Sequence, residues 1–389
     1  MTEQLTASGV TLGVVGGGQL GRMLAEAAAP LGIEVVVLDP TPDCPASPVS
    51  RDQIVGSFDD PDGVDELASR ADYLTYEIEL ADPDLLEQAQ DDHGVVVHPS
   101  PETLRIIQDK LVQNRHLRER GVPIPDFRSV DDAADLAAAL DDLGSPVMLK
   151  ARRGGYDGRG NLPVRDGDDL EAALSEVGAG QGGAMAEAFV EFEREISVIG
   201  VVGDDERTTF SVGENIHDEE ILRTTVVPAR TDGAVRERAE TVARAVLDTL
   251  DGCGVYGIEL FETPDGEIEV NEIAPRPHNS GHWTIEGATT SQFEQHARAV
   301  VGMPLGSTAR RCPTVSVNIL GDVEEPEPAA LSGVREVLST PGAHLHWYGK
   351  REVRPLRKMG HVTLTPTEGE GIEALLAQGR QLRDGLTFE

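Results

Sequence analysis

The sequence has few lysines, few cysteines and no long apolar run, and each absence excludes a class of protein. Only four of the 33 basic residues are lysine, against 69 acidic residues, which gives the 389-residue chain a formal net charge of −36. A field of that sign repels nucleic-acid backbones and anionic membrane surfaces. No stretch approaches the roughly 18 apolar residues of a membrane span, and the N-terminus lacks the pattern of a secretion signal. We therefore expect a soluble, cytoplasmic protein without nucleic-acid or membrane partners.

The three cysteines, Cys44, Cys253 and Cys312, lie far apart and in no metal-ligand spacing. This pattern is typical of a reducing compartment and gives no sign of a structural zinc site. The acid excess does not indicate disorder, because 39% of the residues are hydrophobic and fall in periodic runs. We interpret the acidic surface as an adaptation to high salt. Lysine is so rare that the remaining ones are candidates for roles that arginine cannot fill. They are Lys110, Lys150, Lys350 and Lys358.

The N-terminal region has the pattern of a β-α-β unit. An apolar run, Val10–Val15, leads into the turn GGGQLG (residues 16–21), helix-period residues follow to Ala29, and a second apolar run at residues 34–38 ends at Asp39. Parallel strands joined by a helix are typical of an α/β domain. The turn matches the GxGxxG pattern, which has three interpretations. It could be a dinucleotide site, a tight turn without a ligand, or a cradle for the single phosphate of a substrate.

Periodicity further along the chain predicts a mixture of helices and strands. The predicted strands cover residues 73–78, 95–97 and 147–150, and the predicted helices cover residues 103–120, 131–143 and 234–250. Residues 184–202 alternate in polarity, and the chain from residue 331 onward reads as short strands with turns. We therefore expect a central α+β region followed by a small β-rich tail.

A hairpin near residue 265 brings two carboxylates together. Its strands, residues 255–262 and 267–273, flank Asp265-Gly266, which predicts a two-residue turn and sets Glu259 opposite Glu272. Facing carboxylates repel unless a cation lies between them. With Asn271 as a neutral oxygen donor, this set suits Mg²⁺ shared with substrate phosphates. The alternative interpretation is a pair of solvated acids.

Lysine and glycine residues upstream of this hairpin predict a phosphate site. Lys150 ends a strand and precedes the glycine-rich segment 154–160, which can close over phosphates that the lysine holds. Lys110 can reach the same phosphates from its helix. Neither the GxxxxGK[ST] motif nor a protein-kinase motif set is present, so the ordinary folds that bind nucleoside triphosphates are excluded. Directly after the hairpin, residues 274–282 (APRPHNSGH) gather the groups that would bind a small oxyanion.

Together these segments resemble the ATP-grasp superfamily and, within it, the N5-carboxyaminoimidazole ribonucleotide synthetase family. The resemblance spans nearly the whole chain in the family's order. It rests on GGGQLGRM (16–23), TYEIEL (75–80), QDKLVQN (108–114), KARRGGYDGRGN (150–161), Glu187 and Glu195, HDEEILRTTVVPA (217–229), GIELF (257–261), NEIAPRPHNSGHWT (271–284) and YGKREVRPLRKMGHVT (348–363).

The resemblance implies an α/β and α+β architecture in three parts. These are a Rossmann-like preATP-grasp domain at residues 1–115, an ATP-grasp domain at residues 116–310 and a small β-rich domain at residues 311–389. The implied activity is the ATP- and bicarbonate-dependent carboxylation of 5-aminoimidazole ribonucleotide, through carboxyphosphate, in purine biosynthesis. ATP and Mg²⁺, or Mn²⁺ in its place, are the implied cofactors, and a homodimer is the implied assembly.

The resemblance also implies roles for individual residues. Those for ATP are Lys110, Lys150, Gly155, Tyr156, Asp157, Gly158, Arg159, Gly160, Asn161, Glu187, Ala188, Phe189, Val190, Glu195, His217, Asn271 and Glu272. The metal would lie on Glu259 and Glu272. Those for the ribonucleotide and the oxyanion are Gly18, Gln19, Leu20, Glu77, Glu79, Asp157, Arg276, His278, Asn279, Ser280, Lys350, Arg357 and Lys358. The implied catalytic residues are Lys150, Asp157, Arg276 and His278.

Two alternatives remain at this point. Another ATP-grasp ligase, such as the formate-dependent glycinamide ribonucleotide transformylase, shares the metal hairpin and the acidic EIE segment, so the YGK…RKMGH tail distinguishes the two. A NAD-binding Rossmann protein is supported only by the GxGxxG turn and by Asp39.

Overall fold

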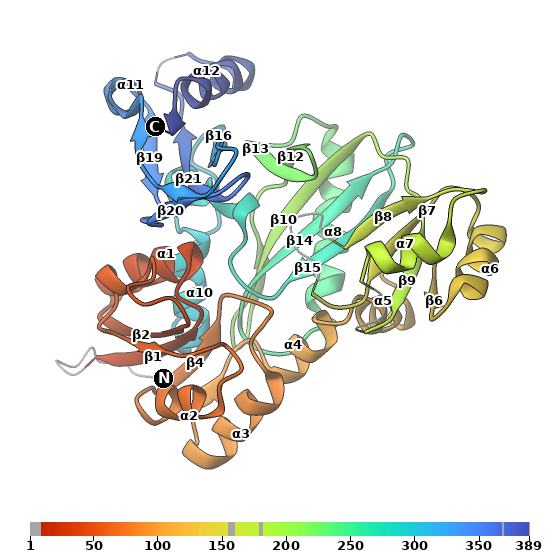
Figure 1. Ribbon diagram of the computed structural model, residues 1–389. Helices are drawn as coiled ribbons and strands as arrows, with labels where there is room; N and C mark the ends of the chain where they lie inside the picture. Colours follow the sequence, from red (N-terminus) through yellow and green to blue (C-terminus); the bar gives the residue numbers. More distant parts are fainter. Residues whose placement is uncertain (1–8, 155–159, 179–181, 368, 389) are drawn as a thin grey trace.

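The computed structural model describes residues 9–154, 160–178, 182–367 and 369–388. Figure 1 shows an N-terminal α/β part, a central pair of sheets and a C-terminal part that rises above the N-terminal one. No helix among the described residues is both long and apolar enough to cross a membrane.

The N-terminal part is a five-stranded parallel sheet with helices on both faces, as the β-α-β pattern predicts. Its strand order is β3-β2-β1-β4-β5. Alternate residues of β1 and β2 point to opposite faces, where α1 and α10 cover one side and α2 and α3 cover the other. The elements are β1 Val10–Val15, α1 Gln19–Ala28, β2 Ile33–Asp39, β3 Asp52–Val55, α2 Pro61–Ser69, β4 Tyr73–Tyr76, α3 Pro83–His93, β5 Val96–Val97 and, from the central part, α10 Gln292–Val300.

The single helix predicted at residues 103–120 is wrong, because two helices occupy this segment. They are α4 Pro101–Ile107 and α5 Lys110–Glu119. Asp109 caps α5, since its carboxylate accepts hydrogen bonds from the backbone N–H groups of Leu111 and Val112. The break places Lys110 at the first position of a helix, where its side chain points toward the central sheets.

The central part consists of two antiparallel sheets. A four-stranded sheet has the order β6-β9-β7-β8 and is covered by α6 and α7. A nine-stranded sheet begins β15-β14-β10-β12-β13 and packs against α8, whose residues Val235, Ala239 and Ala243 recur at helical spacing. The elements are β6 Phe127–Val130, α6 Ala133–Leu143, β7 Val147–Ala151, β8 Asn161–Val164, α7 Leu170–Glu176, β9 Ala184–Ala188, β10 Arg194–Val202, β11 Arg207–Thr209, β12 Gly213–Asp218, β13 Ile221–Val227, α8 Gly233–Leu247, β14 Gly254–Glu262 and β15 Ile268–Ala274.

The β14–β15 hairpin has the predicted carboxylate pairing, but its turn and the register of its strands differ from those predicted. Its turn is wider than the predicted two residues, since the N–H of Thr263 donates to the carbonyl of Glu267 and Gly266 takes φ +79°. A β-bulge at Asn271 then adds one residue to β15 and restores the register, so that Glu259 pairs with Glu272. The bulge therefore places Asn271 and Glu272 together at the same point of the sheet.

The C-terminal part extends the nine-stranded sheet and adds two helices that the expected short strands did not include. Strands β16, β21 and β19 continue the sheet from β13, and α12 packs on them beside Val315 and Leu364. The elements are α9 Thr284–Gly287, β16 Thr314–Leu320, β17 Glu327–Pro328, β18 Leu331–Ser332, α11 Val334–Ser339, β19 Ala343–Trp347, β20 Glu352–Val353, β21 Lys358–Leu364, α12 Ile372–Asp384 and β22 Thr387–Phe388.

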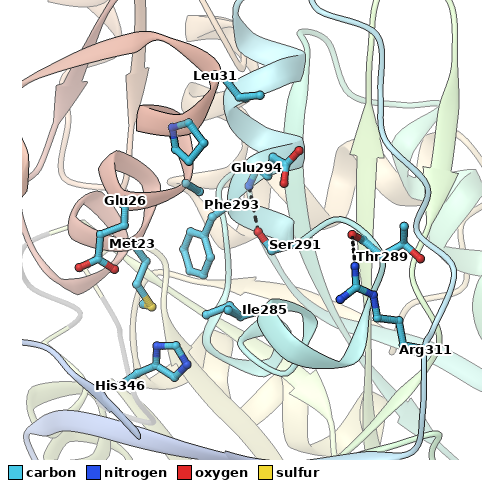
Figure 2. A pocket seen from close by; sticks show the side chains of 12 residues that line it. Met23, Glu26, Leu31, Ile285, Thr289, Ser291, Phe293, Glu294, Arg311 and His346 are labelled. Carbon is cyan, nitrogen blue, oxygen red and sulfur yellow. Dashed lines mark hydrogen bonds between the residues drawn. The ribbon is translucent and has the colours of Figure 1, made fainter. Parts of the chain in front are cut away.

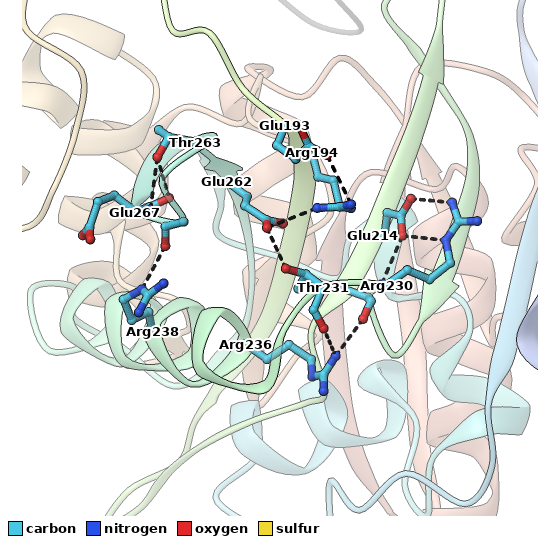
Figure 3. A network of polar contacts seen from close by, with 12 residues as sticks. Glu193, Arg194, Glu214, Arg230, Thr231, Arg236, Arg238, Glu262, Thr263 and Glu267 are labelled. Atoms are coloured by element: carbon cyan, nitrogen blue, oxygen red, sulfur yellow. Dashed lines mark hydrogen bonds and ion pairs between the residues drawn. The ribbon is translucent and has the colours of Figure 1, made fainter.

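A network of ion pairs joins the loop before α8 to the large sheet (Figure 3). Arg230 donates to both carboxylate oxygens of Glu214 on β12, at 2.6 and 2.9 Å. The neighbouring hydroxyl of Thr231 donates to Glu262 on β14 at 2.6 Å, and Arg194 on β10 donates to the same oxygen at 3.2 Å. Three strands and the start of a helix are thereby held together far from the N-terminal part.

Candidate active site

Two lysines from different parts of the chain meet at the bulge of β15. Lys150 on β7 pairs with Glu187 on β9 and donates to Oδ1 of Asn271 at 3.3 Å. Lys110 at the start of α5 lies 3.4 Å from Oε1 of Glu272. The structure thus brings together five residues predicted for ATP, and Lys150 is buried among them.

The paired acids of the hairpin lie beside these lysines, and their pKa values are shifted in opposite directions. Burial, followed by repulsion from Glu272, raises the pKa of Glu259 to about 7. Enclosure would also raise the pKa of Glu272, but the charges of Lys110 and Lys150 outweigh it and lower that pKa. His217 forms an ion pair with Glu195 nearby. Burial opposes the protonation of His217, and Glu195 outweighs it and raises the pKa of the ring.

These acids suit a Mg²⁺ ion that is shared with a substrate. Among the described residues no group of three or more His, Cys, Asp or Glu side chains could hold a metal alone. Glu259 and Glu272 nevertheless face each other across the ladder. Burial and then repulsion from Glu272 raise the pKa of Glu259, and a cation would relieve that repulsion. Mg²⁺ is commonly bound by one or two carboxylates together with substrate phosphates, so two acids are sufficient.

The segment after the hairpin, residues 274–282, gathers donors at one edge of the acid pair; we call it the oxyanion loop. Arg276 pairs with both carboxylate oxygens of Glu79, at 2.8 and 3.0 Å. Nδ1 of His278 lies 2.9 Å from the Ser280 hydroxyl, and its Nε2 lies 3.7 Å from Glu259. Burial, then the charge of Arg276, lowers the pKa of His278 well below its ordinary value, so this ring is neutral at neutral pH.

The side chain of Asn279 in this loop has no hydrogen-bond partner among the described residues. Both its side-chain oxygen and its nitrogen are buried, as is the unpaired Nε of Arg276. Buried polar groups are normally satisfied, so unpaired ones at a site indicate a missing ligand or water. The oxyanion loop therefore presents unused donors beside the acid pair.

The glycine-rich turn at residues 16–21 holds a carboxylate of the protein itself. Glu77, directly after β4, accepts hydrogen bonds from the N–H groups of Gly18 and Gly21, the latter at 2.8 Å. Burial raises the pKa of Glu77 to about 7 against the lowering effect of these N–H groups. Asp39 bonds the N–H groups of Gly17 and Thr41 instead of facing outward. The positions that a dinucleotide pyrophosphate and ribose would need are thus used internally.

The C-terminal lysines lie close to the same region. Lys350 donates to the carbonyl of Lys358 at 2.6 Å, and Arg357 donates to the carbonyl of Glu352 at 2.7 Å. Lys358 lies close enough to Glu259 and His217 for its charge to oppose the net rise in the pKa of each. Tyr348 belongs to the core cluster that contains Leu20 and Met23 of α1. The 348–363 segment therefore connects the N-terminal turn to the acid pair.

Part of the predicted ATP site lies outside the described residues, namely Gly155, Tyr156, Asp157, Gly158 and Arg159. The carbonyl of Gly160 accepts from the N–H of Ala151 at 2.7 Å, and Asn161 opens β8 opposite Lys150. The residues predicted for ATP after Glu187 lie at the end of β9: the N–H of Ala188 donates to the carbonyl of Asp126, Phe189 is exposed and Val190 is half-buried.

Three residues without a predicted role contact this site. Asn114 donates to Glu187 at 2.7 Å. Arg152 donates to both oxygens of Asp109, at 3.0 and 2.6 Å, which joins the end of β7 to the start of α5 and hence Lys150 to Lys110. An aspartate directly before a helical lysine is an N-cap signal that could have located the break in the helix, but the partner Arg152 depends on tertiary structure.

The pocket in Figure 2 lies elsewhere, between α1, α10 and β19. Met23, Phe293 and Ile285 line it together with charged residues such as Glu26 and Arg311. None of the residues predicted for ATP, metal or ribonucleotide lines it. The candidate active site is therefore defined by the side chains around the β15 bulge and not by this pocket.

Family models match the chain in three consecutive segments. A ribonucleotide synthetase preATP-grasp domain matches residues 10–108, an ATP-grasp domain matches residues 115–293, and a phosphoribosylaminoimidazole carboxylase C-terminal domain matches residues 314–374. The last match covers the segment that distinguishes this family from other ATP-grasp ligases.

Curated and solved proteins agree with these matches. The N5-carboxyaminoimidazole ribonucleotide synthase of Brucella melitensis is 43% identical over 91% of this chain and 96% of its own length. The crystal structure of the synthetase from Thermotoga maritima has a TM-score of 0.87 at 41% identity and covers 97% of this chain and 99% of its own. A synthase from Aspergillus clavatus in complex with ADP and 5-aminoimidazole ribonucleotide has a TM-score of 0.88 at 36% identity, with 97% and 99% covered. The chain belongs to the N5-carboxyaminoimidazole ribonucleotide synthase family of ATP-grasp enzymes.

Proposed function

We propose that this chain carboxylates 5-aminoimidazole ribonucleotide with ATP and bicarbonate at the site around the β15 bulge. The observation that carries the proposal is the meeting of Lys110, Lys150 and Glu272 from three separate elements, beside the facing carboxylate of Glu259. Such an arrangement binds polyphosphate and a divalent cation at once. The relatives named above support the ribonucleotide as the acceptor.

Lys150 and Lys110 hold and neutralise the phosphates of ATP in this scheme. Both lysines are now paired with acids of the site, so binding ATP exchanges these contacts for contacts with phosphate oxygens. Mg²⁺, or Mn²⁺ in its place, held by Glu259 and Glu272 with Asn271 adjacent, would supply charge neutralisation at the transferred phosphoryl group. The residues predicted for the rest of the nucleotide are Glu187, Val190, Glu195 and His217.

The oxyanion loop orients bicarbonate for attack on the γ-phosphorus. Arg276 supplies positive charge, and Asn279 supplies the unpaired amide described above. An oxygen of bicarbonate forms the new bond to phosphorus while the bond to ADP breaks, which gives carboxyphosphate. His278 is neutral, so its ring does not repel the cationic Arg276.

The ribonucleotide captures the carbon in the second step. Carboxyphosphate breaks its C–O bond to release phosphate and CO₂, and the 5-amino group of the imidazole forms the new C–N bond and loses a proton. We assign the binding of this substrate to the Gly18-Gln19-Leu20 turn, Glu77, Glu79, Lys350, Arg357 and Lys358. No side-chain nucleophile takes part, so water exclusion is the main requirement for the intermediate.

One assay separates this function from the alternatives. ADP release is measured with 5-aminoimidazole ribonucleotide and bicarbonate, with glycinamide ribonucleotide and formate, and with neither. We expect release that depends on the first pair. Dependence on the second pair would support a transformylase, and no release with either would contradict both.

The location, the assembly and the domain boundaries of the enzyme are proposals as well. We propose a cytoplasmic homodimer whose three domains divide near residues 115 and 310. Analytical ultracentrifugation over a range of protein concentrations tests the assembly, and a single species of 41.6 kDa, the mass of one chain, would contradict it.

A further inference from the structure

Gln292, the first residue of α10, is completely buried directly behind the oxyanion loop. Its amide bonds the backbone of His278 twice. The N–H of His278 donates to Oε1 at 2.9 Å, and Nε2 donates to the carbonyl of His278 at 2.7 Å. A side-chain amide that pairs with both backbone groups of one residue fixes the position and the orientation of that residue.

The same side chain contacts the loop at two further points. Nε2 lies 3.3 Å from Nδ1 of His282, and any side chain at Gly281 would collide with the amide. The backbone N–H of Gln292 donates to the Thr284 hydroxyl at 2.9 Å, and that hydroxyl donates to the carbonyl of Gly281 at 2.6 Å. Residues 278–284 therefore wrap around one glutamine.

The other face of His278 is closely packed as well. It packs on Gly257 of β14, where an added side chain would collide with it, and its Nε2 lies 3.7 Å from Glu259. The loop is thus held between the metal hairpin in front and Gln292 behind. A displacement of His278 would move Asn279 and Ser280, the next two residues, relative to the acid pair.

We propose that Gln292 is a positioning residue that sets where the oxyanion loop holds bicarbonate beside the γ-phosphate of ATP. The proposal rests on the proposed function, because it assumes that bicarbonate binds at this loop. Gln292 touches no substrate in this account and acts through the loop, chiefly through the backbone of His278. Its removal therefore changes the use of bicarbonate and leaves the binding of ATP, which depends on Lys110 and Lys150, nearly unchanged.

The same helix offers a matched control in Gln295. That residue is also completely buried, and its amide pairs in the same two-bond manner with Gly306, at 2.6 and 2.8 Å, far along the chain from the oxyanion loop. Gln292→Met and Gln295→Met each remove a two-bond pairing with the backbone of one residue, so we expect them to cost similar stability. They differ in which loop they release and in the further contact of Gln292 with His282.

Steady-state kinetics of both variants and the unmodified enzyme test the proposal at a temperature at which all three are folded. For Gln292→Met we expect kcat/KM for bicarbonate to fall by about 10- to 100-fold, while KM for ATP changes by less than about threefold. Gln295→Met should keep all constants within about twofold of the unmodified enzyme.

Equal effects of the two variants, or an equal loss for ATP and bicarbonate, would overturn the positioning role. If Gln292→Met does not fold, Gln292→Glu keeps the acceptor for the His278 N–H and replaces the donor with an oxygen that repels the His278 carbonyl. We expect this variant to lower kcat/KM for bicarbonate more than kcat/KM for ATP; unchanged kinetics would contradict the proposal. An unmodified enzyme that does not use bicarbonate would instead refute the proposed function.

Discussion

At the scale of single residues, the carboxylate of Glu272 is repelled by one neighbouring charge and attracted by two others. Glu259 repels it across the ladder, whereas Lys110 and Lys150 stabilise its charge. The substitution Glu272→Gln removes the negative charge that a divalent cation requires. It should lower both ATP hydrolysis and carboxylation by at least about 100-fold. Glu267→Gln, an exposed carboxylate of the same hairpin, is the control. An active Glu272→Gln enzyme would refute the metal site.

Lys350 permits a test of the ribonucleotide site at the same scale. Its amine bonds a carbonyl of its own segment and lies 5.8 Å from the centre of the Tyr348 ring. We expect Lys350→Ala to raise KM for the ribonucleotide by about tenfold, the loss of one charged contact, and to raise KM for ATP much less. The exposed neighbour Arg351, changed to Ala, is the control. A larger effect on ATP would place Lys350 in the nucleotide site.

At the scale of elements, the sequence predicted most strands and helices but not the irregularities that build the site. The facing of Glu259 and Glu272 was predicted correctly, although from a two-residue turn that does not exist. The helix break at Asp109 was missed although its N-cap signal is local, whereas the bulge at Asn271 has no local signal and accompanies a tertiary contact with Lys150. Periodicity reports which face of an element is buried and does not report such contacts.

The pH dependence of stability tests the Glu214–Arg230 ion pair, which joins β12 to the loop before α8. Burial would raise the pKa of Glu214, but the hydrogen bonds from Arg230 outweigh it and lower the pKa below its ordinary value of 4.5. A lowered pKa contributes stability above the unfolded value, and this contribution is lost as the pH falls through the folded one. Arg230→Met should therefore lower the free energy of unfolding by about 2 kcal/mol at neutral pH.

The difference between Arg230→Met and the unmodified chain should shrink as the pH falls below about 4.5. Urea unfolding at several pH values measures it. A difference that is constant over this range would show that the packing of the arginine, and not its charge, is what matters.

At the scale of the whole molecule, a net charge of −36 surrounds a site for anionic substrates. All four lysines fall within segments predicted to bind ATP or the ribonucleotide, whereas the other 29 of the 33 basic residues, all arginine, are spread along the chain. The remaining surface repels itself, and salt shortens the range of this repulsion from about 10 Å at 0.1 M to about 3 Å at 1 M.

We therefore expect the unfolding midpoint to rise by several degrees when KCl is raised from about 0.1 M to about 1 M. Differential scanning fluorimetry measures this shift. Folding and activity that are unimpaired in salt-free buffer would contradict the interpretation of the acidic surface as an adaptation to salt.

The central claim is that bicarbonate attacks ATP at the oxyanion loop. Its most direct test follows ¹⁸O from labelled bicarbonate during turnover with ATP and 5-aminoimidazole ribonucleotide, with the released phosphate analysed by mass spectrometry. The account predicts one ¹⁸O atom in each phosphate released, because the attacking oxygen stays on phosphorus when carboxyphosphate breaks its C–O bond. Phosphate whose new oxygen comes from water would contradict it.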